Sequence, residues 1–492
     1  MEFSQFKNLA APGTIIPVFK KFNADFITPV MAYLKMKEKG KHSFLLESVI
    51  SGDRIGRYSF LGQAPFLIQK YVNDKTLLVH GSRNQVREDN YFKVLKEQLH
   101  SYKMIEIPEL PRFTCGAVGF IGYEMIGNIE KLPAPKTDIV GNDAALMAFY
   151  DHLVAFDHLK NEIILIANVF IDKDSNLEAL YEEAMHRIDS VREKLNRPLN
   201  ANLEFSVNWD TEKSNFKKED YLKAVKTAKE YIFAGDIFQD VVSQRFSVEY
   251  SGEPFQVYRA LRNINPSPYM FYLDFRDYQV IGSSPESLIT ALDSDLEIIP
   301  IAGTRRRGKN INEDEALAEE LLNDPKELAE HVMLVDLARN DLGRISRYGS
   351  VKVHDFKTIQ YYSHVIHIIS RVTGKLKPEL DAVDAFMSAF PAGTVSGAPK
   401  IRAMEIINEL EPERRGIYAG AVGYFDYCGN MDMCIAIRTL VASKGKLFYQ
   451  AGAGIVADSS PELEYKETMN KVKVLRKAAE EAAGGINDII YR

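Results

Sequence analysis

The sequence has little cysteine, no excess of positive charge and no long apolar run, and each shortage excludes a class of protein. Three cysteines in 492 residues (Cys115, Cys428 and Cys434) are too few and too scattered for a disulfide framework or a zinc site. A formal net charge of −7 at pH 7 argues against nonspecific binding to nucleic acid or to an anionic membrane. The first residues, MEFSQFKNLAAPG, lack the basic and apolar regions of a secretory leader, and no apolar run approaches the ~20 residues of a membrane span. We therefore expect a cytoplasmic protein without nucleic-acid or membrane partners.

The composition is otherwise that of an ordinary globular protein, with 46% apolar and 26% charged residues. Its length predicts two or more domains, or one large domain. The stretch from 196 to 215 is polar and has no sustained period, so we interpret it as a linker between an N-terminal half (1–200) and a C-terminal half (216–485). Helical and strand patterns mix without an even βαβ rhythm, and hairpin-like turns favour antiparallel pairing, which indicates an α+β fold.

Residues 323–345 form the clearest predicted helix. Asp324 is a suitable N-cap, Glu327 follows it at capping-box spacing, and Gly343 is suited to end the helix in a left-handed conformation. Apolar residues recur at steps of three and four, which predicts a largely buried helix. Glu327 and Glu330 nevertheless share one face of its first turns, either as acids stabilised by the helix dipole or as part of a site.

A second acidic pair repeats this arrangement near the end of the sequence. Glu464 and Glu467 are again three residues apart in the opening turns of a predicted helix. Four converging carboxylates would repel one another unless a cation neutralised them. With no histidine or cysteine beside either pair, the oxygen-only set suits Mg²⁺ better than zinc. The spacing alone leaves open whether the pairs form a metal site or belong to two independently capped helices.

Glycine-rich turns and one arginine are candidates for binding an anion. Thr394 lies in a turn that runs into a helix, and Gly452 and Gly454 lie in a turn before the second acidic helix. Either turn can also be purely structural. The arginines 305–307 are expected to face solvent. Arg438 lies in the apolar run MCIAIRTLV, which predicts a buried strand, and there it needs an anionic partner.

Taken together, the motifs resemble the anthranilate synthase component I family of chorismate-utilising enzymes. The resembling stretches keep the family's order over nearly the whole chain: LLES (45–48), GRYSFLG, GDIFQDVVSQR, NPSPYMFYL, SPES, PIAGTRRRG, KELAEHVMLVDLARNDLGRI, HVIHIISRV, FPAGTVSGAPK, GAVGYF and AGAGIVADSSPELEYKET. The resemblance implies a four-layer α/β/β/α fold with two orthogonally packed antiparallel sheets. It also implies the conversion of chorismate and ammonia to anthranilate and pyruvate, the first step of tryptophan biosynthesis.

The resemblance assigns roles to particular residues. Glu330 and Glu467 would bind Mg²⁺ directly, with Glu327 and Glu464 bound directly or through water. Glu286 would be the general acid that protonates the leaving C4 hydroxyl, and His367 would serve the elimination of pyruvate. The positions that would contact chorismate are Gly303, Thr304, Thr394, Tyr418, Arg438, Gly452, Ala453, Gly454 and Lys471. The tryptophan-feedback site, regulated through the N-terminal half, would comprise Glu47, Ser48, Pro268, Tyr269 and Met270.

Two further positions, Gln239 and Ala302, bear on the choice within the family. Gln239 stands where isochorismate- and salicylate-forming relatives carry a water-activating lysine, which favours ammonia as the nucleophile. Ala302 stands where many aminodeoxychorismate synthases carry lysine, and Arg306 departs from the family's more frequent proline. No cysteine has a glutaminase context, so ammonia would come from a glutamine amidotransferase subunit, in a heterotetramer of two plus two. The alternatives are an aminodeoxychorismate synthase component I or a non-catalytic, tryptophan-binding regulatory protein.

Overall fold

The computed structural model describes residues 1–48, 56–199, 203–361 and 365–485. The helices are α1 (Phe3–Leu9), α2 (Pro29–Met36), α3 (Tyr91–Leu99), η1 (Tyr123–Asn128), α4 (Leu177–Asn196), α5 (Lys218–Ala234), α6 (Phe255–Ile264), α7 (Ile311–Leu322), α8 (Pro325–Ile345), α9 (Ala382–Ala389), α10 (Gly393–Ser396), α11 (Lys400–Leu410) and α12 (Pro461–Ala483). None of these helices is both long enough and apolar enough to cross a bilayer.

The strands form two large sheets. The first contains β12 (Phe205–Ser214), β13 (Gln239–Gly252), β25 (Lys446–Ile455), β24 (Thr439–Ser443), β15 (Tyr278–Ser284), β14 (Tyr269–Asp274), β2 (Ser43–Glu47), β3 (Tyr58–Gln63), β10 (His152–Asp157), β11 (Glu162–Ile171), β1 (Thr14–Asn23) and β7 (Lys103–Met104), in that order, with β21 (Gly397–Ala398) beside β13. The second contains β18 (Ile301–Arg306), β20 (Val365–Lys375), β17 (Asp295–Ile298), β16 (Ser287–Leu292), β23 (Met431–Ile435), β22 (Ala421–Asp426), β8 (Gly116–Ile121), β9 (Ala145–Tyr150), β4 (Leu67–Val72), β5 (Lys75–His80) and β6 (Arg83–Arg87), with β19 (Lys352–Tyr361) beside β20.

Both sheets are built mainly from antiparallel pairs and draw strands from both halves of the chain. The short pairing of β1 with β7 is parallel. In the first sheet β2 pairs with β14, and in the second β8 pairs with β22. The division at about residue 200 therefore lies within a fold whose two halves share both sheets.

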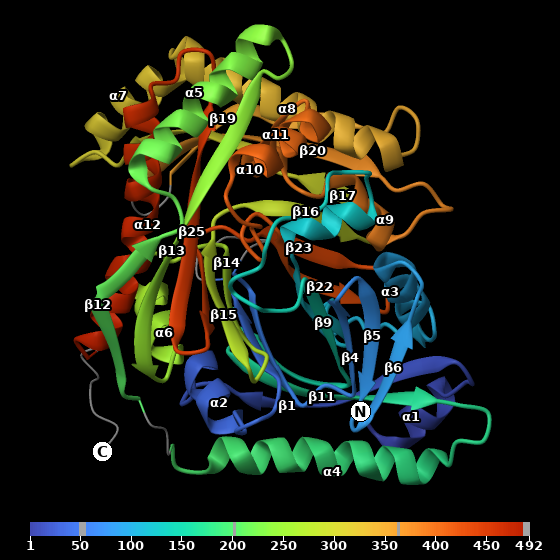
Figure 1. Ribbon diagram of the computed structural model, residues 1–492. Coiled ribbons are helices and arrows are strands. Elements are labelled where there is room, and N and C mark those ends of the chain that lie inside the picture. Colours follow the sequence, from blue (N-terminus) through green and yellow to red (C-terminus); the bar gives the residue numbers. More distant parts are fainter. Residues whose placement is uncertain (49–55, 200–202, 362–364, 486–492) are drawn as a thin grey trace.

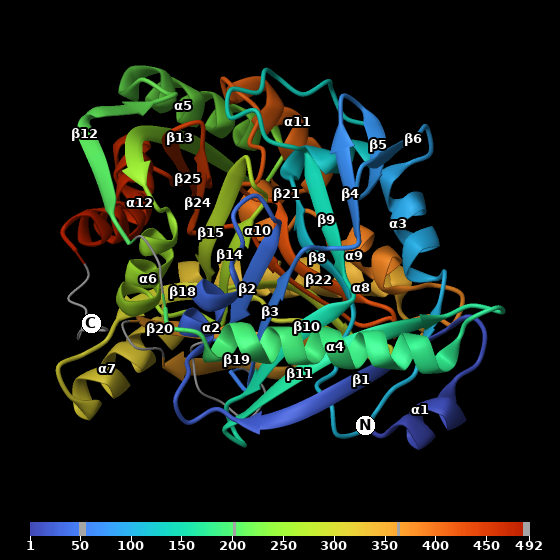
Figure 2. The same cartoon turned by 90° about the horizontal axis from the view of Figure 1, so that it is seen from below.

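Helices cover the outer faces of the two sheets (Figure 1), and three apolar clusters separate the layers. One, which includes Phe44, Phe271 and Phe120, lies between the two sheets. A second packs the first sheet against α2, α4, α6 and α12, and Figure 2 shows α4 lying across β10 and β11. The third packs the second sheet against α3, α8 and α9. The layers thus run helix, sheet, sheet, helix, which confirms the predicted α+β fold.

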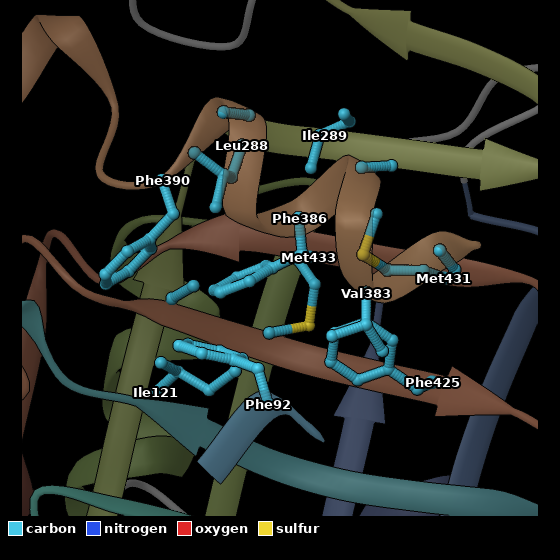
Figure 3. Close-up of a cluster of buried hydrophobic side chains, with 14 of the residues drawn as sticks. Phe92, Ile121, Leu288, Ile289, Val383, Phe386, Phe390, Phe425, Met431 and Met433 are labelled. Atoms are coloured by element: carbon cyan, nitrogen blue, oxygen red, sulfur yellow. The ribbon is translucent and has the colours of Figure 1, made fainter. Parts of the chain in front are cut away.

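The third cluster fixes the strand that follows one of the predicted catalytic residues. Figure 3 shows Phe386 of α9 in the same cluster as Leu288 and Ile289 of β16. The Phe386 ring centroid lies 5.9 Å from that of Phe92 and 5.9 Å from that of Phe425. Truncating a phenylalanine in such a setting costs about 3–5 kcal/mol. The strand that begins directly after Glu286 is therefore held rigidly.

Helix α8 begins where the sequence predicts and ends later. The Asp324 carboxylate accepts hydrogen bonds from the backbone N–H groups of Lys326 and Glu327 at 3.0 and 3.3 Å, a cap worth about 1 kcal/mol. The helix continues through Gly343 to Ile345, so the predicted end at Gly343 is wrong. Leu342 and Ile345 are buried, and packing of this last turn outweighs the low helix propensity of glycine.

The predicted linker also contains regular structure. Residues 205–214 form β12, an edge strand that pairs with β13. Phe205, Val207 and Trp209 alternate with polar residues and pack on the second apolar cluster. Because the alternation extends over only five residues, the surrounding polar residues hide it in the sequence.

Candidate functional site

Glu286 lies where the chain passes from one sheet to the other. It follows β15 of the first sheet and directly precedes β16 of the second. Burial raises the pKa of the Glu286 carboxyl to about 7, and the Thr394 hydroxyl, Lys471 and Arg438 each oppose this rise. A carboxyl with such a pKa carries a proton over the pH range in which a general acid is needed.

Arg438 occupies the equivalent crossing in the opposite direction. It lies between β23 of the second sheet and β24 of the first, so the predicted strand through this residue is wrong. Its φ of +48° places it in the left-handed region, which is costly for an arginine. Burial lowers the pKa of the Arg438 guanidinium, and the charge of Glu286 opposes that effect. Within the described ranges Arg438 makes no ion pair, and its Nη1 lies 3.5 Å from Oδ1 of Asn265. The guanidinium therefore still needs an anion.

Thr394 stands beside Glu286, near the start of α10. Its buried Oγ1 acts on the pKa of the Glu286 carboxyl, but it makes no hydrogen bond of normal geometry within the described ranges. Glu286 and Thr394 line a cavity of about 40 Å³, which Leu334 and Leu337 of α8 help to close. A buried hydroxyl without a partner is costly, and a bound polar molecule would satisfy it.

The glycines of β25 approach the other walls of the site closely. A Cβ atom on Gly452 would lie 3.0 Å from the Tyr418 hydroxyl, and one on Gly454 would lie 2.7 Å from Nε2 of Gln239. Strand β24 pairs with β25 only as far as Tyr449, so the edge of residues 452–454 that faces away from β13 has no strand partner in the described chain. Backbone groups on such an edge are available to a ligand.

Lys471 joins this edge to the second acidic helix. Its Nζ donates to the Gly452 carbonyl oxygen at 2.9 Å and lies 2.8 Å from Oε1 of Glu467. The structure therefore brings Lys471, predicted to contact chorismate, and Glu467, predicted to bind metal, to the same place.

The four predicted metal ligands act on one another across α8 and α12. Burial, followed by the charge of Glu327, raises the pKa of the Glu330 carboxyl, and Glu467 on the other helix raises it further. Burial also raises the pKa of Glu464, and Glu467 adds to that rise. Such mutual repulsion is relieved when a cation binds between the carboxylates.

Cationic side chains already neutralise two of these acids. Arg305 pairs with Glu327 at 3.3 Å and with Asp324 at 2.9 Å, so the prediction that it faces solvent is wrong. Glu467 pairs with Lys471. In the part of the chain that the structure describes, no three histidine, cysteine or acidic side chains are arranged to hold a metal ion. The oxygen donors suit Mg²⁺, which takes few protein ligands, and each ion pair engages only one oxygen of its carboxylate.

His367 is held in one tautomer by β18. Its Nδ1 lies 2.8 Å from the Gly303 carbonyl oxygen and 3.2 Å from Oγ1 of Thr304. Because a carbonyl oxygen only accepts, Nδ1 carries the proton and Nε2 is the basic nitrogen of the ring. Burial lowers the pKa of His367, which keeps the imidazole neutral. Gly303 sits in a bulge with φ +66°, and a Cβ there would lie 3.2 Å from Oε2 of Glu327.

The predicted tryptophan-site residues form a separate group. Glu47 ends β2 and pairs in register with Met270 of β14. The carboxylate of Glu47 accepts hydrogen bonds from the Tyr258 hydroxyl at 2.5 Å and from Nε of Arg262 at 3.1 Å. Next to it, Oγ of Ser48 is buried and has no hydrogen-bond partner in the described ranges. Pro268 and Tyr269 directly precede Met270, and the Tyr269 hydroxyl donates to Asp432 at 3.1 Å.

Sequence patterns miss the groups that hold the predicted residues in place. Tyr258 and Arg262 are four residues apart on α6, which places them on one face but does not indicate their contact with Glu47. Asn265, which caps the C-terminal end of the same helix, lies next to Arg438 and shows no signal in the sequence. Arg305 lies in a run of three arginines that reads as solvated surface.

Comparisons with known proteins show what the chain is similar to over nearly its whole length. A family profile described as chorismate binding enzyme matches residues 57–477. Anthranilate synthase component 1 of Acetivibrio thermocellus is 46% identical over 485 residues, 97% of each chain. Its namesake from Synechocystis sp. is 46% identical over 500 residues, 97% of this chain and 98% of that one.

Two solved structures have the same fold. Anthranilate synthase component I from Streptococcus pneumoniae matches with a TM-score of 0.78 at 39% identity, covering 93% of this chain and 99% of that one. The menaquinone-specific isochorismate synthase from Escherichia coli matches with a TM-score of 0.72 at 18% identity, covering 97% of this chain and 99% of that one.

Proposed function

Because the chain belongs to the family of chorismate binding enzymes, we propose that it converts chorismate and ammonia to anthranilate and pyruvate, the first step of tryptophan biosynthesis. The observation that carries this proposal is the buried Glu286, whose pKa is raised to about 7 beside Arg438, a guanidinium that makes no ion pair within the described ranges. An acid that can give up a proton thus lies next to a group that needs an anion. The names of the similar full-length relatives support the same reaction.

The substrate is held by its negative charges. Arg438 and the open backbone edge of residues 452–454 bind anionic groups of chorismate, and Lys471 adds a positive charge at the same edge. The Thr394 hydroxyl and the Tyr418 ring form further walls. The carboxylates Glu330 and Glu467 would hold Mg²⁺, with Glu327 and Glu464 bound directly or through water. When bound, the ion supplies the positive charge that fixes one carboxylate of the substrate.

The reaction then proceeds in two stages. Ammonia attacks C2 of chorismate while the C4 hydroxyl leaves with the proton of Glu286. In the second stage a proton is removed from the ring, pyruvate is eliminated and the ring becomes aromatic. We assign His367 to this stage, because its Nδ1 is engaged by Gly303 and its basic Nε2 is the nitrogen able to take a proton.

The nucleophile is ammonia rather than water. Gln239 is 4% exposed and its amide Nε2 points towards Gly454, yet an amide cannot deprotonate water. Its Oε1 is buried without a hydrogen-bond partner in the described chain, and it is suited to accept one from ammonia. We propose that a glutamine amidotransferase subunit supplies ammonia, in a heterotetramer of two plus two. The relatives' designation as component 1 supports a second component.

Tryptophan inhibits the enzyme through the group around Glu47 and Ser48. A short path of contacts links this group with the substrate arginine. Met270 pairs with Ser283, whose hydroxyl lies 2.8 Å from the amide nitrogen of Asn265, and Asn265 in turn faces Arg438. A ligand that shifts β2 against β14 can therefore alter the position of Arg438. The coupling requires two states of the enzyme that differ in tryptophan affinity.

Turnover of chorismate by the pure chain tests the proposal. The chain is incubated with chorismate, Mg²⁺ and an ammonium salt at alkaline pH, where more ammonia is unprotonated. Blue-fluorescent anthranilate is the expected product. Aminodeoxychorismate without aromatisation would instead indicate an aminodeoxychorismate synthase component I. Absence of turnover combined with tight tryptophan binding would indicate a regulatory protein.

A further inference from the structure

A buried ion pair joins Arg415 and Glu411 behind the candidate substrate site. The Arg415 side chain is 1% exposed and that of Glu411 is 4% exposed. Nη2 and Nε of Arg415 donate to the two carboxylate oxygens of Glu411 at 2.6 and 3.0 Å. This bidentate geometry holds the guanidinium plane in one orientation.

The remaining donors of Arg415 reach two segments that carry candidate substrate contacts. Nη1 donates to the Val395 carbonyl oxygen at 2.6 Å, directly after Thr394 in the chain. Nη2 also donates to the carbonyl oxygen of Val241. Val241 lies on β13 opposite Gly454, so this contact supports one of the glycines that line the site.

Glu411 supports the same strand two residues further along. Its Oε1 accepts hydrogen bonds from both the backbone N–H and the hydroxyl of Ser243, each at 2.7 Å. Ser243 pairs with Gly452. The two members of the ion pair thus fix β13 opposite both Gly452 and Gly454.

Aromatic rings cover the guanidinium of Arg415. Its central carbon lies 5.8 Å from the ring centroid of Tyr418 and 4.7 Å from that of Tyr123 in the N-terminal half. The Glu124 carboxylate accepts hydrogen bonds from the backbone N–H groups of Arg415 and Gly416 at 2.6 and 2.9 Å. The N-terminal half therefore anchors the segment that bears the arginine.

We propose that the Arg415–Glu411 pair is a positioning device that sets Thr394, Tyr418 and the glycines of β25 in the geometry that binds chorismate. This inference rests on the proposed function. A buried ion pair adds little net stability compared with an apolar pair of the same volume, so stability alone does not account for it. Only a planar guanidinium has enough fixed donors to bind Glu411, Val395 and Val241 at once, while its face packs on Tyr418.

Substitution of Arg415 and of Ser243 tests the proposal with ammonium as the nitrogen source. Arg415→Lys keeps the positive charge but loses the bidentate guanidinium donors. We expect the KM for chorismate to rise about tenfold, the effect of one lost charged hydrogen bond, with a smaller change in kcat. Ser243→Ala leaves both charges in place and removes the hydroxyl's bond to Glu411 together with the one it accepts from Gln450, and we expect a rise of about threefold. The KM for ammonia should not change in either variant.

Arg414→Lys is the matched control. Arg414 is the neighbouring residue and pairs with Asp138, away from the substrate segments. The KM of Arg414→Lys for chorismate should therefore stay within about twofold of that of the parent. A merely structural role would lower the unfolding midpoint of Arg415→Lys and leave the KM unchanged, which would overturn the proposal. If Arg415→Lys does not fold, an unchanged KM in Ser243→Ala would do the same. A parent chain without turnover would refute the proposed function instead.

Discussion

At the scale of single residues, the environment of each group determines what it can do. Glu286 and Glu467 are both glutamates in the same site. Burial keeps a proton on Glu286 near neutral pH, whereas Glu467 forms an ion pair with Lys471. Glu286 is thereby suited to donate a proton and Glu467 to bind a cation. Sequence alone distinguishes these roles only through the motif in which each residue lies.

The proton on Glu286 predicts how activity depends on pH. Because the protonated form is active and its pKa in the free protein is about 7, kcat/KM for chorismate should fall as pH rises above 7, by about tenfold per unit. The measurement is kcat/KM against pH with the concentration of unprotonated ammonia held constant, since that concentration otherwise rises with pH.

Glu286→Gln removes the acid while keeping the shape of the side chain. We expect kcat to fall by about 10²–10⁴-fold and the decline above pH 7 to disappear. An unchanged chorismate affinity in the variant would show that its site is intact. Persistence of the alkaline decline in Glu286→Gln would show that another group supplies the proton.

The residues of the site could largely be named from the sequence, but their partners could not. The motifs single out Glu327 and Arg438, whereas the pairing of Arg305 with Glu327 joins β18 to α8 and has no local signal. Arg438 was expected in a strand because its neighbours are apolar. The structure instead places it in a left-handed turn between two sheets, a feature that hydrophobic pattern does not encode.

At the scale of elements, α8 shows which part of a helix the sequence specifies. Its start depends on a local hydrogen bond from the Asp324 cap and could be predicted to the residue. Its end depends on burial of Leu342 and Ile345 against distant residues, so Gly343 gave a misleading signal. Strand β12 was missed for a related reason, since its short alternation gains meaning only from pairing with β13.

The first turns of α8 predict a change in metal requirement. The charge of Glu467 on α12 raises the pKa of Glu330 on α8. We therefore expect Glu330 to bind Mg²⁺ directly. Glu330→Gln should raise the Mg²⁺ concentration for half-maximal activity by about tenfold or more. Titration of activity with Mg²⁺ at saturating chorismate measures the effect.

Asp336→Asn on the same helix serves as the control for Glu330→Gln. Asp336 is solvent-exposed and, among the described residues, pairs only with Arg339, at 2.7 Å, so the Mg²⁺ dependence of Asp336→Asn should match that of the parent. An equal Mg²⁺ requirement in Glu330→Gln and the parent would remove the metal-binding role of this carboxylate.

At the scale of the whole molecule, the two halves of the chain form one structure. Strand β2 of the N-terminal half pairs with β14, and the segment Tyr123–Asn128 packs against the loop that carries Arg415. The class of the fold could be inferred from local patterns, but the order of strands in each sheet could not. Pairing of strands more than 200 residues apart depends on contacts that no local period records.

The shared sheet predicts that inhibition can be lost without loss of activity. Ser48 follows β2 and its buried hydroxyl has no hydrogen-bond partner among the described residues, whereas the chorismate site lies beyond β14 and Asn265. Ser48→Ala should therefore raise the tryptophan concentration for half-inhibition by about tenfold and leave the uninhibited rate nearly unchanged. The tenfold figure is the effect of one well-placed hydrogen bond to the ligand.

Ser43→Ala on the same strand is the matched control. The Ser43 hydroxyl lies 2.9 Å from that of Tyr33, so its loss should lower stability without altering inhibition. Inhibition of Ser48→Ala at the parent's tryptophan concentration would show that the inhibitor binds elsewhere.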